Sequence, residues 1–208
     1  MKHLFYSKFL KTTLLRFMFI SVLSVTLLPT SCRKDDKEDI LPPIVYPEEN
    51  PLTPFLLAAE FTKVIETLNS GDYESGLTFS PLVKGKINAV TLKIPDVASN
   101  VRVTIWYATT KAPIRTILLD VTSSHTTVTK TIDPLILEKD KEYMISMNTN
   151  DWFENRKSAG GSAVYPITGG NIKFLNYKWK SGTAQVFPTN ISTSYTAGDV
   201  SFVFQQVD

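Results

Sequence analysis

The stretch Asn100-Val-Arg-Val-Thr-Ile-Trp-Tyr107 decides the fold class of this 208-residue chain. From Val101 onward every second residue is apolar or aromatic, and the polar Arg102 and Thr104 fall between them. Successive side chains of a β-strand point to opposite faces, so a period of two predicts a strand with one buried face. An α-helix would instead repeat its apolar residues every three to four positions.

The same period recurs over most of the chain beyond residue 60. We predict about nine strands, over residues 61–68, 77–79, 90–94, 101–107, 114–121, 126–132, 143–148, 172–179 and 200–205. Turn-forming pairs such as Asp133-Pro134 and Gly169-Gly170 separate the segments, and no segment has a convincing amphipathic helical pattern. Short strands at this spacing predict an all-β fold, an antiparallel β-sandwich of the jelly-roll or immunoglobulin-like kind.

Residues 1–31 have the layout of a secretory signal peptide. They carry four Lys or Arg residues and no acidic residue, and residues 17–31 carry no charge. A membrane-spanning helix needs about 20 predominantly apolar residues, which is longer than this uncharged run. Cleavage by the ordinary signal peptidase prefers small residues just before the cut, and Pro29 fits that pattern poorly.

Cys32, the only cysteine, follows this segment directly. A signal followed at once by a lone cysteine resembles the lipobox of bacterial lipoproteins, although Pro29 replaces the usual aliphatic residue. The resemblance implies that Cys32 carries acyl chains such as palmitate and holds the protein on a lipid bilayer. A free thiol would be an odd leftover in an exported domain, which favours the same interpretation.

Residues 32–52 are predicted to be a tether, and residues 53–208 the folded domain. The tether is charged throughout from Arg33 to Asp39, and four prolines between residues 42 and 51 stiffen the rest. Cys32-Arg-Lys-Asp-Asp36 resembles the export signal of Bacteroidota lipoproteins. The resemblance implies a lipid anchor in the outer membrane with the domain facing the cell exterior, and an anchor facing the periplasm is the alternative.

The charge balance changes once the signal peptide is removed. The full chain has 22 basic and 20 acidic residues, and loss of the four basic residues of the signal leaves 18 against 20, a net charge of −2. No block of Lys and Arg follows residue 37. This distribution excludes the electrostatic footprint of a nucleic-acid partner.

The residue types point away from catalysis, metals and cofactors. His125 is the only histidine after the signal peptide, which excludes multi-histidine metal sites and Cys–His catalysis. No phosphate-binding glycine loop is present. Two carboxylates suffice for a glycosidase, but nothing in the sequence brings Asp151 and Glu154 together. We therefore expect a protein that is not an enzyme.

The segment Asn148-Thr-Asn-Asp-Trp-Phe-Glu-Asn-Arg156 is the first candidate ligand site. It follows a regular strand and is predicted to form a loop in which polar side chains surround two aromatic rings. Such a mixture suits a carbohydrate, because rings stack on the apolar face of a sugar while polar groups bind its hydroxyls. The candidate ligand-binding residues here are Asn150, Asp151, Trp152, Phe153 and Arg156. The alternative is that Trp152 or Phe153 folds back and caps the core, as bulky aromatic residues often do.

A second aromatic group lies on the predicted strand 172–179. Phe174 is in register with Ile172 and is expected in the core, whereas Tyr177 and Trp179 have the opposite parity and are expected on the other face. That face is either a ligand platform or is covered by the loop around residue 150. Asn148, Asn150 and Asp151 could also offer oxygen ligands to Ca²⁺, but the spacing of an EF-hand is absent and we predict no metal.

Several landmarks are similar to the bacterial domain of unknown function 4082. They include Gly71-Asp-Tyr-Glu-Ser-Gly-Leu-Thr-Phe-Ser-Pro81, Val103-Thr-Ile-Trp106 and Gly169-Gly-Asn-Ile-Lys-Phe174, and the resemblance extends to Phe204. That family occurs in secreted proteins, often beside immunoglobulin-like repeats and polysaccharide-acting modules. It has no established catalytic residues, so none is carried over, and Ser201 departs from its usual acidic residue.

Together these patterns predict a membrane-anchored lipoprotein with a non-catalytic binding domain. A polysaccharide is the leading ligand. The alternative is a structural or adhesion-type subunit of a cell-surface assembly, with another cell-surface protein as partner through strand-edge pairing.

Overall fold

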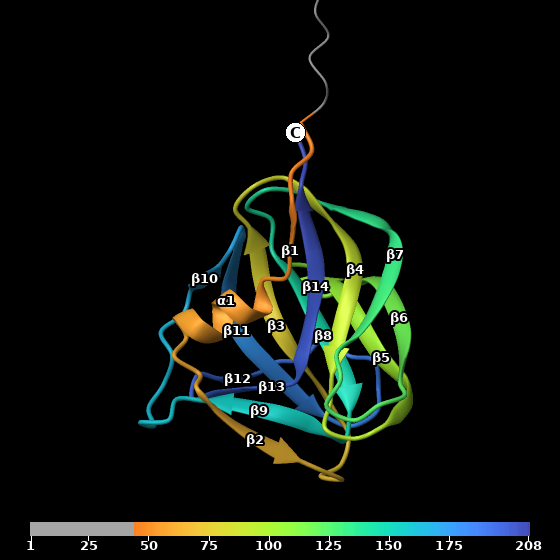
Figure 1. The fold of residues 1–208 in the computed structure, drawn as a ribbon, viewed down its shortest axis with the longest axis vertical. Helices are drawn as coiled ribbons and strands as arrows, with labels where there is room; N and C mark the ends of the chain where they lie inside the picture. Colours follow the sequence, from red (N-terminus) through yellow and green to blue (C-terminus); the bar gives the residue numbers. More distant parts are fainter. Residues whose placement is uncertain (1–43) are drawn as a thin grey trace, which may run out of the picture. The chain divides into compact units, whose positions relative to one another are not determined.

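The computed structural model describes residues 44–208, which form one short helix and fourteen strands (Figure 1). The predicted signal peptide, Cys32 and the tether as far as residue 43 lie outside the described residues. No helix within residues 44–208 is long and apolar enough to cross a membrane.

Two large antiparallel sheets form the sandwich. The first has the strand order β1-β14-β4-β7. Its strands are β1 (Glu48–Glu49), β14 (Asp199–Gln206), β4 (Gly85–Lys93) and β7 (Val128–Leu137). The second has the order β10-β11-β3-β8-β5-β6, and β12 also pairs with β11. Its strands are β10 (Ile167–Gly169), β11 (Ile172–Ser181), β3 (Tyr73–Pro81), β8 (Tyr143–Thr149), β5 (Ala98–Tyr107), β6 (Pro113–Val121) and β12 (Asn190–Ser192).

A small third sheet has the order β13-β9-β2. Its strands are β13 (Tyr195–Ala197), β9 (Trp152–Arg156) and β2 (Lys63–Thr67). In Figure 1 this sheet lies across the lower end of the domain, opposite the end that carries the C-terminus. Gly198 links β13 to β14 with φ +96°, a left-handed conformation that favours glycine.

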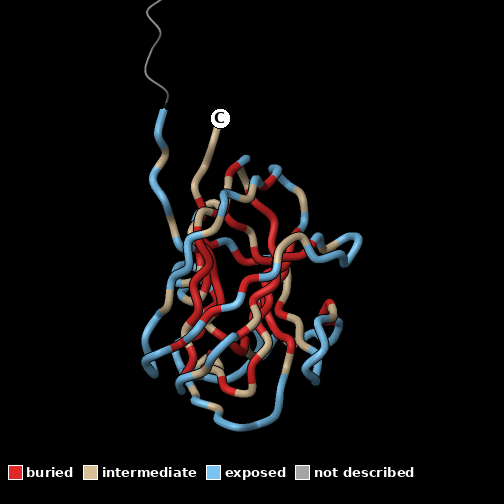
Figure 2. The backbone as a smooth tube through the Cα atoms, turned by 90° about the vertical axis from the view of Figure 1, so that its right-hand side faces the viewer, coloured by how far each residue is buried: buried red, intermediate tan, exposed pale blue. Residues whose placement is uncertain are grey.

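The main core lies between the two large sheets and is aromatic at its centre. Phe79 packs against Phe202 with ring centroids 4.7 Å apart and against Tyr143 at 5.8 Å, and all three are buried. Figure 2 shows the buried backbone running through the middle of the domain, with exposed segments concentrated in the loops and edges. The predicted all-β sandwich is confirmed.

The outer face of the second sheet carries a smaller core. Trp106, Met144 and Phe187 are buried together there. Beside them Glu74, fully buried, forms an ion pair with Arg102 at 2.8 Å and accepts a hydrogen bond from Ser146. Burial raises the pKa of Glu74, while its hydrogen bonds with Arg102 and Ser146 oppose that shift. The second sheet is therefore covered on both faces along part of its length.

All nine predicted strand segments overlap a strand of the structure, and the other five strands are short. The predicted turn at Asp133-Pro134 was wrong, because β7 continues through it. The pairing of β4 with β7 shifts register between Ile87 and Ala89, opposite this point. An edge strand tolerates proline at such a bulge because no ladder hydrogen bond is lost.

The folded domain begins upstream of the boundary predicted at residue 53. Glu48 and Glu49 pair with β14, and the Asn50 amide nitrogen donates a hydrogen bond to Thr91 Oγ1 at 3.1 Å. The helix α1 (Leu52–Ala58) follows, with Phe55 fully buried. Composition alone suggested a stiff tether here, but backbone pairing with β14 does not depend on the polar side chains of this segment.

Candidate functional site

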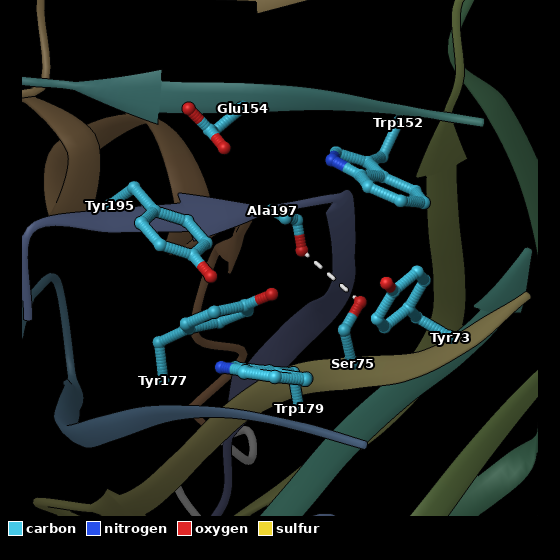
Figure 3. Close-up of a pocket in the computed structure, with 8 residues that line it drawn as sticks. All are labelled: Tyr73, Ser75, Trp152, Glu154, Tyr177, Trp179, Tyr195 and Ala197. Atoms are coloured by element: carbon cyan, nitrogen blue, oxygen red, sulfur yellow. Dashed lines mark hydrogen bonds between the residues drawn. The ribbon is translucent and has the colours of Figure 1, made fainter. Parts of the chain in front are cut away.

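A partly enclosed cavity of about 150 Å³ lies between the small third sheet and one end of the second sheet (Figure 3). Five of the eight residues that line it are aromatic. The lining residues are Tyr73, Ser75, Trp152, Glu154, Tyr177, Trp179, Tyr195 and Ala197. We call this cavity the aromatic pocket.

The strands β3 and β11 form one wall of the aromatic pocket. Trp179 pairs directly with Ser75, and residues directly opposite each other in an antiparallel pair share a face. Tyr73 and Tyr177 lie two positions away on their own strands and face the same side. Four of the eight lining side chains therefore come from a single strand pair.

The prediction that Tyr177 and Trp179 lie on the face of β11 opposite Phe174 was wrong. Phe174 and Tyr177 are both buried on the core side, although their spacing in the sequence is odd. The pairing of β11 with β3 shifts register between Phe174 and Asn176, so Leu175 is an extra residue. One extra residue moves every later side chain of the strand to the opposite face. The bulge thus turns Tyr177 and Trp179 inward.

The strands β9 and β13 form the opposite wall, which corrects the prediction of a loop around Trp152. Residues Trp152–Arg156 form β9, which pairs with β2 on one side and β13 on the other. Alternation along β9 sends Trp152 and Glu154 into the pocket and Phe153 to the other side. Tyr195 and Ala197 reach the pocket from β13 by the same alternation.

The aromatic pocket has a closed inner end and a more open outer one. Ser75, Tyr177 and Ala197 are each at most 5% exposed, and Ser75 Oγ donates a hydrogen bond to the Ala197 carbonyl oxygen at 3.3 Å. The remaining lining residues are only partly buried. Ser75, Tyr177 and Ala197 therefore form a floor, and the partly exposed rings form walls around a mouth.

The rings of the walls pack edge to face rather than in parallel stacks. Tyr73 lies at an interplanar angle of 77° to Trp152, with centroids 5.2 Å apart, and at 60° to Trp179, with centroids 5.8 Å apart. Tyr177 and Tyr195 are 5.5 Å apart. Such contacts hold large rings in one arrangement. In Figure 3 the hydroxyl groups of Tyr177 and Tyr195 point toward the middle of the cavity.

One charged pair lies at the mouth. Glu154 accepts a hydrogen bond from Arg156 Nε, and the Arg156 guanidinium lies 5.5 Å from the centroid of the Tyr195 ring. The hydrogen bond with Glu154 raises the pKa of Arg156. Burial, followed by the negative charge of Glu154, raises the pKa of Tyr195. Burial also raises the pKa of Tyr177, so both phenols are neutral at physiological pH.

The indole nitrogen of Trp152 is buried and has no hydrogen-bond partner among residues 44–208. In Figure 3 this nitrogen points toward the cavity rather than into the core. An unpaired buried N–H costs about 1–3 kcal/mol relative to a paired one. Trp152 therefore carries a donor that a bound ligand could use.

The structure brings three of the predicted ligand residues together and separates the others. Trp152, Tyr177 and Trp179, predicted from two distant segments, line the same pocket. Arg156 lies at the mouth of the pocket, where its Nε donates a hydrogen bond to Glu154. Asn150 and Asp151 lie elsewhere and both contact Asn69.

Phe153 is buried on the far side of β9. Its ring centroid lies 5.5 Å from the His125 ring and 4.8 Å from Lys93 Nζ. Of the two residues for which the sequence left a core-capping role open, Trp152 packs against the main core while it also lines the pocket, and Phe153 is buried outside that core.

The remaining sequence hypotheses concern metals and paired carboxylates. Asp151 is buried and accepts a hydrogen bond from the Asn69 backbone N–H at 2.7 Å, whereas Glu154 lines the pocket. The two carboxylates therefore do not face the same cavity. Within the described part of the chain, no group of three or more His, Cys, Asp and Glu side chains could hold a metal ion.

Sequence reasoning missed Tyr73, Ser75, Tyr195 and Ala197. Tyr73 and Ser75 continue the alternation of the predicted strand 77–79 toward its N-terminus, so extending that pattern would have found them. Tyr195 and Ala197 lie on a strand of three residues, which is too short for a period to be visible.

Comparison of the chain with known protein families and with curated proteins found no match.

Proposed function

We propose that this chain is a membrane-anchored, cell-surface lipoprotein that binds a glycan in the aromatic pocket and does not catalyse a reaction. The observation that carries the proposal is the convergence of five aromatic side chains and one carboxylate on a cavity of about 150 Å³. Aromatic walls with a few inward-facing polar groups are typical of ligand sites, and stacking on rings suits the apolar face of a sugar.

The position of the pocket supports a display role. The described chain enters the domain at Ile44, beside the C-terminal strand, and β1 pairs with that strand. The strands β9 and β13, which supply half of the residues that line the aromatic pocket, lie at the other end of the domain (Figure 1). A lipid attached to Cys32 would therefore connect to the domain at the end opposite the third sheet.

The resemblance to domain 4082 is part of the proposal. Proteins with that domain often carry polysaccharide-acting modules, which favours a glycan ligand over a protein. The outer-membrane location and the outward orientation rest on residues 1–36 and are proposed on that ground alone.

A polysaccharide array tests the proposal with a soluble form that begins at Arg33. We expect binding to at least one glycan, with loss of binding in Trp152→Ala and Trp179→Ala. Tyr107→Ala is the matched control, because Tyr107 is an exposed aromatic residue outside the pocket. Absence of binding to every glycan, or equal loss in the control, would contradict the proposal.

A second candidate, a structural subunit that pairs through a strand edge, is favoured by the seam between β6 and β7. These two edge strands leave a broad shallow hollow that includes the half-exposed Leu118. However, Lys130 Nζ donates to the Leu118 carbonyl oxygen at 2.8 Å, and Arg115 donates to the Asp133 carbonyl oxygen. Basic side chains that occupy edge carbonyls protect against pairing, so we rank this candidate second.

A further inference from the structure

We infer that the aromatic pocket selects the uncharged terminal sugar ring of a glycan chain, not a ring inside the chain. This inference rests on the proposed glycan function and adds to it the part of the ligand that is recognised. Three features of the pocket carry the inference: its closed floor and size, its unpaired donor, and its balanced charge.

The closed floor decides that a chain can enter only by its end. A ring inside a polymer is substituted on two sides, so its site needs two openings. Here Ser75, Tyr177 and Ala197 close the inner end, and the hydrogen bond from Ser75 to the Ala197 carbonyl ties β3 to β13 across it. A cavity of about 150 Å³ has the size of one that holds a single benzene ring, so the pocket has room for no more than one sugar ring.

The polar groups of the walls favour a ligand that both accepts and donates hydrogen bonds. Trp152 Nε1 is a donor without a partner among the described residues, and Glu154 is an acceptor. A sugar hydroxyl provides both an acceptor and a donor. A quaternary ammonium ion, which aromatic cages also bind, has no acceptor and would leave the indole N–H unpaired.

The charges at the mouth favour an uncharged ring. Glu154 is the only acidic residue among the eight lining residues, none of which is Lys or Arg, and Arg156 pairs with it from the rim. A carboxylate on the ligand would face Glu154, and an amino group would have to compete with Arg156. A buried charge without a new partner is strongly disfavoured.

Titration calorimetry with the soluble form tests the inference. The probes are the methyl glycosides of glucose, galactose, mannose and N-acetylglucosamine, and the linear oligosaccharides of two to six units built from whichever sugar binds. We expect the dissociation constants of the oligosaccharides to agree within about twofold, because one terminal ring enters whatever the chain length. The uronic-acid and amino counterparts of the same sugar are expected to bind about tenfold more weakly, which is about 1.4 kcal/mol.

Arg156→Gln provides the specificity test. Removal of the guanidinium leaves the charge of Glu154 unpaired, so this variant is expected to bind the amino sugar about tenfold more tightly than the original chain does. Lys157→Gln is the control because it also removes one positive charge. Lys157 pairs with Glu60 at 2.8 Å and does not line the pocket. An amino-sugar affinity unchanged by Arg156→Gln, or raised equally by Lys157→Gln, would overturn the charge argument.

Chain-length dependence separates failure of this inference from failure of the proposed function. An affinity that rises steadily from two to six units, without binding of the methyl glycoside, would overturn end recognition and leave glycan binding intact. Absence of binding by every sugar and on the array would overturn both.

Discussion

Replacing the indole of Trp152 by a phenyl ring should change the stability of the domain far less than the same replacement at Trp106. Trp106 is 2% exposed, and its Nε1 donates to Ser146 Oγ at 2.8 Å. Trp106→Phe therefore loses a buried hydrogen bond, about 1 kcal/mol, and leaves a cavity that adds a further 1–2 kcal/mol or so. We expect a total loss of about 2–3 kcal/mol.

Trp152 differs in both respects, since it is only partly buried and its indole N–H has no hydrogen-bond partner in the described part of the chain. Trp152→Phe removes a donor whose burial costs about 1–3 kcal/mol, which offsets the loss of ring contacts. We expect the net change to lie within about 1 kcal/mol of zero. Urea unfolding of the soluble form, followed by circular dichroism, measures both changes. Equal losses of unfolding free energy in the two variants would contradict the claim that Trp152 Nε1 lacks a partner, and with it the hydrogen-bonding argument for the ligand.

Three further predictions concern the anchor, the location and the effect of pH. Cys32→Ala should release the protein from the membrane fraction, and full retention without detergent would contradict lipid attachment. External protease should remove the domain from intact cells, with protection when Asp35 and Asp36 are changed to Ala; complete protection of the original protein would place it in the periplasm. Burial raises the pKa of Asp199 above 3.8, so its proton is held more tightly in the folded state and stability falls as the pH rises from about 4 through the raised pKa. Asp199→Asn should therefore flatten the decline of the urea midpoint over that window, and an unchanged slope would contradict this account.

The long strands were predictable because their apolar period is regular and local. The alternation at Val101–Tyr107 recurs along β6, where Ile117, Leu119 and Val121 are buried and the residues between them are exposed. Strand β9 escaped prediction because Trp152 and Phe153 are adjacent and both aromatic, which hides the alternation between the two faces of the strand. The two-residue strand β1 and the three-residue strand β13 are held by pairing with distant strands, which leaves no local signal.

The pocket was predictable in its parts and not as a whole. Trp152 and Trp179 stood out as aromatic residues in polar surroundings, but they lie 27 positions apart in the sequence. Their meeting depends on the bulge at Leu175 and on the position of the third sheet over the second. A single inserted residue in a strand leaves no mark on composition, so the parity of Tyr177 could not be read correctly.

The central claim, that a glycan binds in the aromatic pocket, is tested most directly by the indole N–H signals of the three tryptophans in a ¹⁵N NMR titration. Two of them, Trp152 and Trp179, line the pocket, and Trp106 lies in the outer core. On addition of a glycan selected from the array, the account predicts saturable shifts of the Trp152 and Trp179 signals and a stationary Trp106 signal. Binding that leaves the Trp152 and Trp179 signals in place would contradict it.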